Sequence, residues 1–234
     1  DEDVRTALSM EKCIEVLEEA YKDLGKGSAV SPGRRDCFLA STRPNTYYSF
    51  KTIDGGLERL QVYVQRVDSD LISYQAVNGT ARRVKVPAAP GNRYVGLVYL
   101  YSTETLELLA IMNDGHLQRM RVAGTTGVAA KYLAREDART LALLGSGWQA
   151  EAAAWALATV RKLVTIRVCS PNLENRQSLA KKLGETLPCE TIAVDAPGKA
   201  VEGADIVATA TNSQGPVVFG KWISQGMHLT CITP

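Results

Sequence analysis

The spacing of apolar positions changes character about halfway along the chain. Residues 9–26 place apolar side chains at helical spacing and end at a glycine, which predicts an amphipathic helix. Segments 59–67, 81–87, 93–102 and 106–113 favour strands, with Asn78-Gly79 as a hairpin turn. Residues 32–56 have weak periodicity, and no element is predicted there. A helix over 117–134 follows, with Asp114 and Gly115 in a turn and His116 in a loop before it. The small residues of this helix permit either close packing or approach to a ligand.

From Thr140 onward, predicted strands and helices alternate. The order is strand 140–145, helix 148–162, strand 164–169, helix 173–185, strand 189–194, a short helix near 197–203, and strands 205–210 and 226–233. Strands separated by helices indicate βαβ units and a parallel sheet. We therefore predict an α/β protein in which a Rossmann-type domain, residues 139–234, follows an N-terminal α+β domain, residues 1–138.

The first turn of the predicted parallel sheet carries the clearest motif. "TLALLGSGWQA" places Gly145 and Gly147 between an apolar strand and a helix, with Ala150 as the small third residue. In a dinucleotide-binding turn these residues allow the tight turn, the approach of a pyrophosphate, and close helix–strand packing. We predict that Gly145, Ser146, Gly147, Trp148, Gln149 and Ala150 bind the cofactor. The alternative is a purely structural turn.

The end of the second strand of this domain bears on the choice of nucleotide. An NAD site normally has a carboxylate there to bind the ribose 2′-hydroxyl. This sequence has Ser170, followed by Asn175 and Arg176, and a guanidinium is suited to pairing with a 2′-phosphate. We therefore favour NADP(H), with NAD(H) as the alternative. In a simpler reading, Asn175 and Arg176 only begin a solvated helix.

Two further places are candidates for cofactor contact. Thr211 and Asn212 follow strand 205–210 at the carboxyl edge of the sheet, where open α/β folds bind ligands. Thr125, in the helix over 117–134, is a candidate for phosphate contact. Each also has a plain structural reading, as a polar strand end or as a packed helix residue.

The block "MNDGHLQRMRVAGTTGVAAKYLARED" (112–137), directly followed by "LALLGSGWQA" (141–150), is similar to the ornithine cyclodeaminase/mu-crystallin family. Segments such as "GRRDCFL" (33–39), "YVQRVDSD" (63–70) and "GMHLTCIT" (226–233) extend the resemblance over nearly the whole chain. It implies a nucleotide-binding domain paired with a domain for substrate binding and dimerisation, hence a homodimer. It also implies that the substrates are amino or imino acids, used with NAD(H) or NADP(H).

The resemblance also implies basic residues that hold the substrate carboxylate. Arginine binds carboxylates bidentately and so fixes their orientation as well as their charge. Arg34, Arg66 and Arg121 match the family positions, and Lys51 is a fallback for the central one. Arg66 stands where a lysine is commoner, which suggests a differently shaped or larger acid.

These assignments have alternatives. Arg35 is able to replace Arg34, and either arginine is equally suited to a plain surface position. Arg66, in an alternating strand, has the alternatives of facing solvent or pairing with Asp68 or Asp70.

The resemblance leaves three functions open. The first is an NAD(P)-dependent oxidoreductase that reduces a 2-imino acid or oxidises an amino acid. The second is an ornithine cyclodeaminase, whose dependence on a tightly held NAD conflicts with the non-acidic end of the second strand. Its members use an aspartate after the strand corresponding to "MHLTCITP", and no residue here is assigned that role because the sequence stops at Pro234. The segment expected to complete the dimerisation domain is absent too. The third is a non-catalytic binder of a nucleotide or small ligand.

Composition narrows the remaining choices. A net charge of +2 gives no bulk electrostatic case for nucleic acid. No apolar run reaches the roughly 18 residues of a membrane span. Five scattered cysteines without a CxxC pair suggest reduced thiols in a cytoplasmic protein, and two histidines argue against a histidine-rich metal site.

Overall fold

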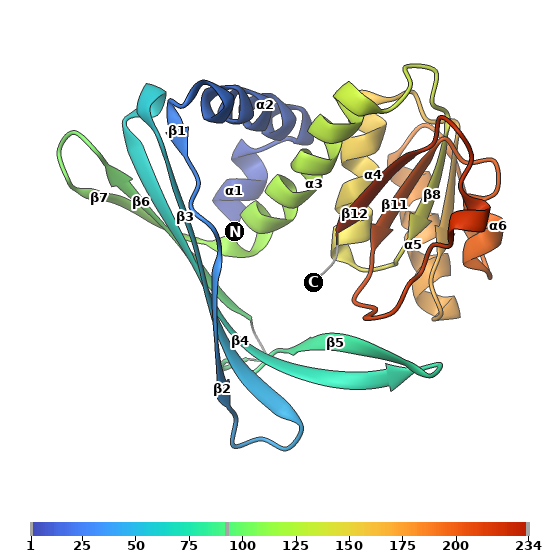
Figure 1. Ribbon diagram of the computed structural model, residues 1–234, viewed down its shortest axis with the longest axis horizontal. Coiled ribbons are helices and arrows are strands. Elements are labelled where there is room, and N and C mark those ends of the chain that lie inside the picture. The colour runs from blue at the N-terminus through green and yellow to red at the C-terminus, as the bar shows by residue number, and fades with distance from the viewer. Residues whose placement is uncertain (1, 92–93, 233–234) are drawn as a thin grey trace. The chain divides into compact units, whose positions relative to one another are not determined.

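The computed structural model describes residues 2–91 and 94–232 (Figure 1). Two compact units are present, which we call unit 1 (residues 1–8 and 18–118) and unit 2 (residues 9–17 and 119–234). The predicted domain boundary at 138/139 divides the chain by function, into a substrate-binding and a nucleotide-binding part, and it stays a prediction. Arg93, Thr233 and Pro234, at the ends of predicted segments, lie outside the described residues.

Unit 1 is built on an antiparallel seven-stranded sheet with the order β1-β3-β4-β6-β7, in which β2 pairs with β3 and β5 pairs with β4. The strands are β1 (Ala29–Val30), β2 (Arg35–Ala40), β3 (Thr46–Leu57), β4 (Val62–Val77), β5 (Thr80–Val86), β6 (Val95–Ser102) and β7 (Leu108–Asn113). Helix α1 (Glu2–Ala7) and a 3₁₀ turn, η1 (Glu58–Leu60), complete the elements that lie wholly in this unit.

Two predictions for the strands of this unit need correction. Residues 32–56, which yielded no element, contain β2 and most of β3. The strand predicted over 59–67 begins only at Val62, after the 3₁₀ turn and Gln61 at φ 50°, and it continues to Val77. Polar residues at its buried positions hid the apolar alternation. The hairpin turn at Asn78-Gly79 is confirmed, with φ of 50° and 74° at its two residues.

Unit 2 contains a parallel five-stranded sheet with the order β10-β9-β8-β11-β12, the arrangement of a Rossmann-type half. Its strands are β8 (Thr140–Leu144), β9 (Thr165–Cys169), β10 (Glu190–Val194), β11 (Ile206–Ala210) and β12 (His228–Ile232). Between them lie α4 (Trp148–Val160), α5 (Leu173–Thr186), α6 (Pro197–Val201) and the 3₁₀ turn η2 (Gly220–Trp222). The predicted α/β fold class is confirmed, and every predicted element of this region is present.

Two helices contribute residues to both units, α2 (Met10–Lys26) and α3 (Asp114–Leu133). Asp114, Gly115 and His116 form the first turn of α3, so the predicted turn and loop are wrong; an aspartate is favourable at a helix N-terminus. Within unit 2, Gly124 and Gly127 let α2 approach α3 closely. A Cβ added at Gly124 would lie 2.6 Å from a methyl of Leu17, and one added at Gly127 would lie 2.7 Å from a methyl of Ile14.

The core of unit 2 covers both faces of its sheet. Strand β8 is buried along Leu141–Leu144, with neighbours from α3, α4 and α5 on one face and from α6 on the other. Such a strand reads as a continuous apolar run, as expected of a covered parallel sheet. In the ranges the structure describes, no helix has both the length and the apolar character needed to cross a membrane.

Candidate functional site

The glycine turn of unit 2 lies where β8, β9 and β11 end. Gly145 has φ +131°, and a Cβ there would lie 2.1 Å from the carbonyl oxygen of Ala210 on β11. Its N–H donates to the carbonyl oxygen of Cys169 on β9, at 2.8 Å. Only glycine fits this position, because both the dihedral angle and the contact exclude a side chain.

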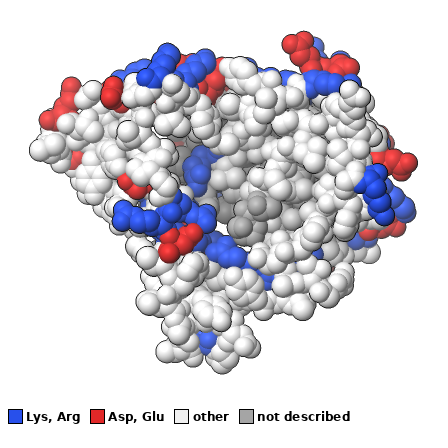
Figure 2. All heavy atoms as spheres, in the orientation of Figure 1, with Lys and Arg blue, Asp and Glu red and all other residues white. Residues whose placement is uncertain are grey.

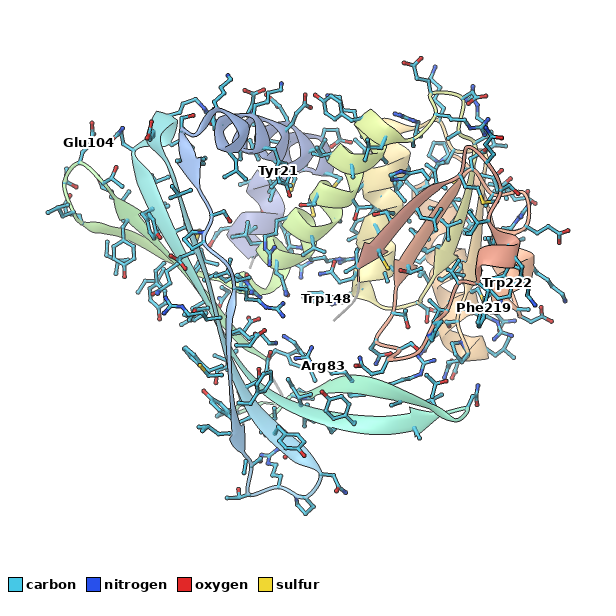
Figure 3. All side chains as sticks on the ribbon, viewed as in Figure 1. Tyr21, Arg83, Glu104, Trp148, Phe219 and Trp222 are labelled. Carbon is cyan, nitrogen blue, oxygen red and sulfur yellow. The ribbon has the colours of Figure 1, made fainter. Side chains whose placement is uncertain are left out.

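Helix α4 begins without a side-chain cap. Its N-cap is Gly147, which makes no capping bond, and a Cβ at Gly147 would meet no atom within 4 Å. Gly147 and Trp148 are exposed, and Figure 3 labels Trp148 at the start of α4. Gln149 is half-buried, and Ala150, the small third residue, is fully buried. The unsatisfied N–H groups of this first turn therefore have the properties of an anion-binding site.

Arg119, which the sequence analysis missed, fixes this first turn from α3. Its Nε donates to the carbonyl oxygen of Trp148 at 3.1 Å, and its Nη2 lies 3.0 Å from the carboxylate of Glu151. The guanidinium also stacks over Trp155, and Lys182 lies 2.9 Å from Glu151 on its other side. Glu151 is 7% exposed. A glutamate within an otherwise alanine-rich helix was the available signal for a buried partner.

The end of β9 is tied to the glycine turn by side chains. Ser146 Oγ donates to Ser170 Oγ at 2.8 Å, and Arg176 Nη1 donates to the carbonyl oxygen of Ser170 at 2.9 Å. Asn172 caps α5 by accepting from the backbone N–H of Asn175 at 2.8 Å. The guanidinium of Arg176 is thus held beside the end of β9, which carries no carboxylate.

Other candidate cofactor contacts are placed less distinctively. Thr211 follows β11, is half-buried and accepts a bond from Ser213 N at 3.2 Å, while Asn212 is exposed. Thr125 is exposed on α3, and its hydroxyl donates to the carbonyl oxygen of Arg121 one turn earlier, at 3.0 Å. Their proposed roles stay predictions.

In unit 1, one face of the sheet carries buried charged side chains, which we call the polar face. Asp68 and Asp70 alternate along β4, and Lys51 on β3 stands opposite Asp68. Lys51 Nζ donates to Asp70 at 2.8 Å, and Lys85 of β5 lies 2.8 Å from the same carboxylate. Burial lowers the pKa of the Lys51 ammonium. Burial alone would raise the pKa of Asp70, but hydrogen bonds from both lysines lower it.

Arg66 occupies the same face two residues before Asp68. Its Nη2 lies 2.6 Å from Asp68 and 2.6 Å from Asp114, the first residue of α3. Arg66 is 7% exposed and Asp114 is 3% exposed. Among the described residues, the Arg66 Nε and Asp114 Oδ1 atoms are buried without a hydrogen-bond partner. The cluster thus has one open donor and one open acceptor.

The predicted carboxylate binders fall in both units. Arg66 and Lys51 share the polar face of unit 1. Arg34 precedes β2, is about half exposed and pairs with Asp36 at 2.8 Å. Arg121 lies on α3 in unit 2 and is half-buried. Of the pairings considered for Arg66, the one with Asp68 is present, whereas Asp70 pairs with the lysines. Within residues 2–91 and 94–232, no group of three or more His, Cys, Asp or Glu residues is placed to hold a metal ion.

Comparison with known proteins gives a consistent picture. The chain is 27% identical over 230 residues to a Delta(1)-pyrroline-2-carboxylate reductase of Bacillus cereus, covering 97% of this chain and 65% of that protein. The chain therefore spans about two thirds of the length of the curated relatives it matches.

Solved structures agree with this similarity. The Thermococcus litoralis Delta(1)-pyrroline-2-carboxylate reductase, solved with NADH and L-proline, superposes with a TM-score of 0.82 at 26% identity, over 99% of this chain and 67% of that one. An archaeal alanine dehydrogenase dimer with bound NAD has the same fold, with a TM-score of 0.80 at 22% identity over 98% of this chain and 64% of that one.

A sequence model of the ornithine cyclodeaminase/mu-crystallin family matches residues 1–234, the full length of the chain. The Rossmann-type sheet, its glycine turn and the antiparallel sheet of unit 1 agree with that match. The chain therefore belongs to the ornithine cyclodeaminase/mu-crystallin family.

Proposed function

We propose that this protein is an NAD(P)-dependent oxidoreductase that interconverts a 2-imino acid and the corresponding amino acid. The observation that carries the proposal is the turn at Gly145, whose backbone only glycine permits and which opens onto the uncapped helix α4. The Bacillus cereus relative, named as a Delta(1)-pyrroline-2-carboxylate reductase, and the solved reductase with NADH and L-proline support the choice of reaction. When bound, the nicotinamide supplies or accepts the hydride.

The residues of unit 2 fit such a cofactor. Gly145 would shape the turn, while the backbone N–H groups of Ser146, Gly147, Trp148 and Gln149 would hold the pyrophosphate. Arg119 fixes the helix turn that presents them. Thr211 and Asn212 would contact the ribose or the nicotinamide, and Thr125 a phosphate. Because α4 has no side-chain cap, an anionic ligand would satisfy its first N–H groups.

For the substrate, we propose that Arg121, Arg34 and Arg66 hold the carboxylate, with Lys51 as the fallback for the central position. Asp68 and Asp114 pair with the Nη2 of Arg66, whereas its Nε is buried and has no hydrogen-bond partner among the described residues. We propose that this Nε is the donor to the substrate carboxylate. A guanidinium fixed by two aspartates keeps its orientation, and fixed donors position C2 for hydride transfer.

We further propose that NADP(H) is favoured over NAD(H). Arg176 is held at the end of β9, where a carboxylate would otherwise select NAD. Thermal-shift titrations with NADPH and NADH test this for the wild type and Arg176→Ala, with Lys181→Ala on the same helix as the control. We expect NADPH to stabilise the wild type more and only Arg176→Ala to remove that advantage. Equal shifts in wild type and Arg176→Ala would refute it.

The reaction itself is tested with Δ1-pyrroline-2-carboxylate as the probe. Net oxidation of NADPH or NADH with formation of proline supports the proposal. Ammonia release from ornithine without net change of cofactor would instead identify a cyclodeaminase, and nucleotide binding without turnover of a panel of imino acids would identify a binder.

We also propose a homodimer formed through the second face of the unit 1 sheet. This face lies opposite the polar face and exposes Leu39, Phe50, Val95 and Ile111, each at least 37% accessible. Apolar side chains in such number are typical of an interface. Light scattering on Phe50→Lys and Ile111→Lys tests it, since loss of a dimer is expected only if this face is buried.

The five cysteines are free in the structure, and we propose a cytoplasmic location on that basis.

A further inference from the structure

The outer part of the β4–β5 hairpin, from Leu71 onward, carries positive charge without an acidic residue, because Asp68 and Asp70 lie earlier on β4. From Leu71 to Gly91 the sequence contains Arg82, Arg83 and Lys85 but no Asp or Glu. Successive residues of a strand point to opposite faces, so Arg83 and Lys85 share one face while Arg82 points to the other. The register pairs Lys85 with Ile72 and Arg83 with Tyr74, which places both on the polar face of unit 1. Figure 3 shows Arg83 projecting from β5.

The charges on the polar face do not cancel. Arg66 is matched by Asp68 and Asp114, whereas Asp70 serves both Lys51 and Lys85 at 2.8 Å. No hydrogen bond or ion pair joins Arg83 to any residue that the structure describes. Asp36 of β2 lies opposite Lys51 on this face and is paired with Arg34. The remaining charged groups are four cations, Lys51, Arg66, Arg83 and Lys85, and three carboxylates, Asp68, Asp70 and Asp114. The cation without a carboxylate partner, Arg83, lies at the β5 end. Figure 2 shows Lys and Arg side chains over this part of unit 1, with Asp and Glu side chains beside them.

Arg83 lies close to the buried charges rather than out in solvent. It is half-buried, and its charge, together with that of Lys85, contributes to lowering the pKa of Lys51, after the larger effect of burial. Asp70 is already shared by Lys51 and Lys85. A third cation, Arg83, partly desolvated beside these two, is therefore costly unless a further anion joins it. One more negative charge beside Arg83 would therefore be electrostatically favourable.

We propose that Arg83, with Lys85, binds an anionic group on the side chain of the substrate, so that the substrate is a 2-imino or 2-amino dicarboxylic acid. This inference rests on the proposed function, which places the substrate carboxylate at Arg66 on the same face. The same excess of positive charge repels the side-chain ammonium of a diamino acid. Ornithine is therefore disfavoured, which separates this chain from a cyclodeaminase by its substrate side chain.

Three five-carbon amino acids test the proposal because they differ only at the far end of the side chain. L-glutamate ends in a carboxylate, L-norvaline in a methyl group and L-ornithine in an aminomethyl group. Their affinities for the full-length protein, saturated with oxidised nucleotide, are measured by calorimetry. A hydrogen-bonded ion pair predicts that glutamate binds at least about tenfold more tightly than norvaline. Ornithine should bind most weakly.

The variant Arg83→Gln should remove the preference for glutamate while leaving norvaline binding unchanged. Arg82→Gln, on the opposite face of the same strand, is the matched control and should keep the preference. Arg83→Lys should keep part of it, because the charge remains without the bidentate geometry. Thermal melting of each variant verifies that the protein is folded.

Several results would overturn the inference: norvaline or ornithine binding as tightly as glutamate in the wild type, an unchanged preference in Arg83→Gln, or no binding of any of the three. Turnover is measured separately with NADPH and NADH. A glutamate preference that depends on Arg83, without turnover of any imino acid, would refute the proposed oxidoreductase function and leave the anion site standing. Turnover of a neutral imino acid without a glutamate preference would refute the anion site and support the oxidoreductase function.

Discussion

The central strands of the two sheets place polar groups in opposite ways. Strand β8 of unit 2 buries a continuous apolar run, Leu141–Leu144, and the candidate site begins only where the strand ends. Strand β4 of unit 1 instead buries Arg66, Asp68 and Asp70 in its middle, at every second position. The strands of a parallel sheet covered on both faces are near-continuous apolar runs, whereas an antiparallel sheet can give one face to polar groups.

This difference separates two kinds of recognition. In unit 2, the groups proposed to bind the ligand are backbone N–H donors, and their arrangement depends on shape at Gly145 and Gly147. In unit 1, they are side chains, and their arrangement depends on a balance of charges around Arg66 and Asp70. Substitutions in unit 2 should therefore act through steric fit, and those in unit 1 through unmatched charge.

The largest expected effect is that of Gly145→Ala. A Cβ would overlap the carbonyl oxygen of Ala210, and backbone on a central strand cannot move aside cheaply. We expect a loss of about 4 kcal/mol or more in the free energy of unfolding, and loss of nucleotide binding. Urea denaturation and nucleotide titration measure the two effects.

Gly147→Ala is the matched control, since φ is −87° and its Cβ would meet no atom. Its stability should stay within about 0.5 kcal/mol of the wild type, while nucleotide affinity falls because the Cβ occupies the approach to the helix N-terminus. If Gly145→Ala proved as stable as Gly147→Ala, the steric account of this turn would be wrong.

In unit 1, Arg66→Gln should have the next largest effect. Removing the guanidinium leaves Asp68 and Asp114 buried without their shared partner, which costs about 3 kcal/mol of stability. Adding Asp114→Asn should recover part of that loss, because one of the unmatched charges is removed. Urea denaturation of the single and double variants gives the coupling; additive losses would show that Arg66 and Asp114 are not energetically paired.

The same contrast explains what sequence reasoning was able to predict. The apolar strands and glycine turn of unit 2 follow standard patterns, so its elements were placed to within a few residues. In unit 1, the continuation of β4 beyond residue 67 was missed because its buried positions hold Asp68 and Asp70. Most of β3 was missed because Ser49 and Lys51 take buried positions. A polar residue indicates a buried position only when the residue that pairs with it is also known.

The candidate site was predictable to the same extent. The turn at Gly145 was predicted from local spacing alone and is present, while the role of its residues in cofactor binding stays a prediction. The partners Asp114, Arg119 and Lys85 were missed because each meets its counterpart across a long stretch of sequence. Arg66, Asp68 and Asp70 at intervals of two did indicate a shared face, but not which acid pairs with which base.

A smaller effect is expected for Asp205→Asn in unit 2. Asp205 accepts from the N–H groups of Arg139 and Thr140 at 2.8 and 2.9 Å, and it pairs with Arg135. Burial alone would raise its pKa, but the backbone hydrogen bonds lower it below the usual value. The pKa in the folded state is therefore below that in the unfolded state. The resulting stability is complete above about pH 4 and is lost as the pH falls through the folded pKa.

We expect Asp205→Asn to lose about 1–2 kcal/mol at pH 7, where the carboxylate is ionised. Its stability should then change less than that of the wild type between pH 5 and about pH 3, because the titrating group is gone. Denaturation curves across this range make the measurement. Parallel acid profiles for the two proteins would contradict the assignment of the pH dependence to Asp205.

The smallest effect concerns the two helices that follow the glycine turn and the end of β9. Helix α4 begins without a side-chain cap, whereas α5 begins with Asn172, whose side chain accepts from Asn175 N. Asn172→Ala should cost about 1 kcal/mol of stability, while Asn172→Asp should keep the cap. The aspartate also places a carboxylate beside Arg176, where a 2′-phosphate is proposed to bind. Asn172→Asp should therefore retain the stability of the wild type but lose its preference for NADPH over NADH, as measured by thermal-shift titration. Equal destabilisation by the two variants would mean that the Asn172 cap contributes nothing, and an unchanged NADPH preference in Asn172→Asp would place the 2′-phosphate elsewhere.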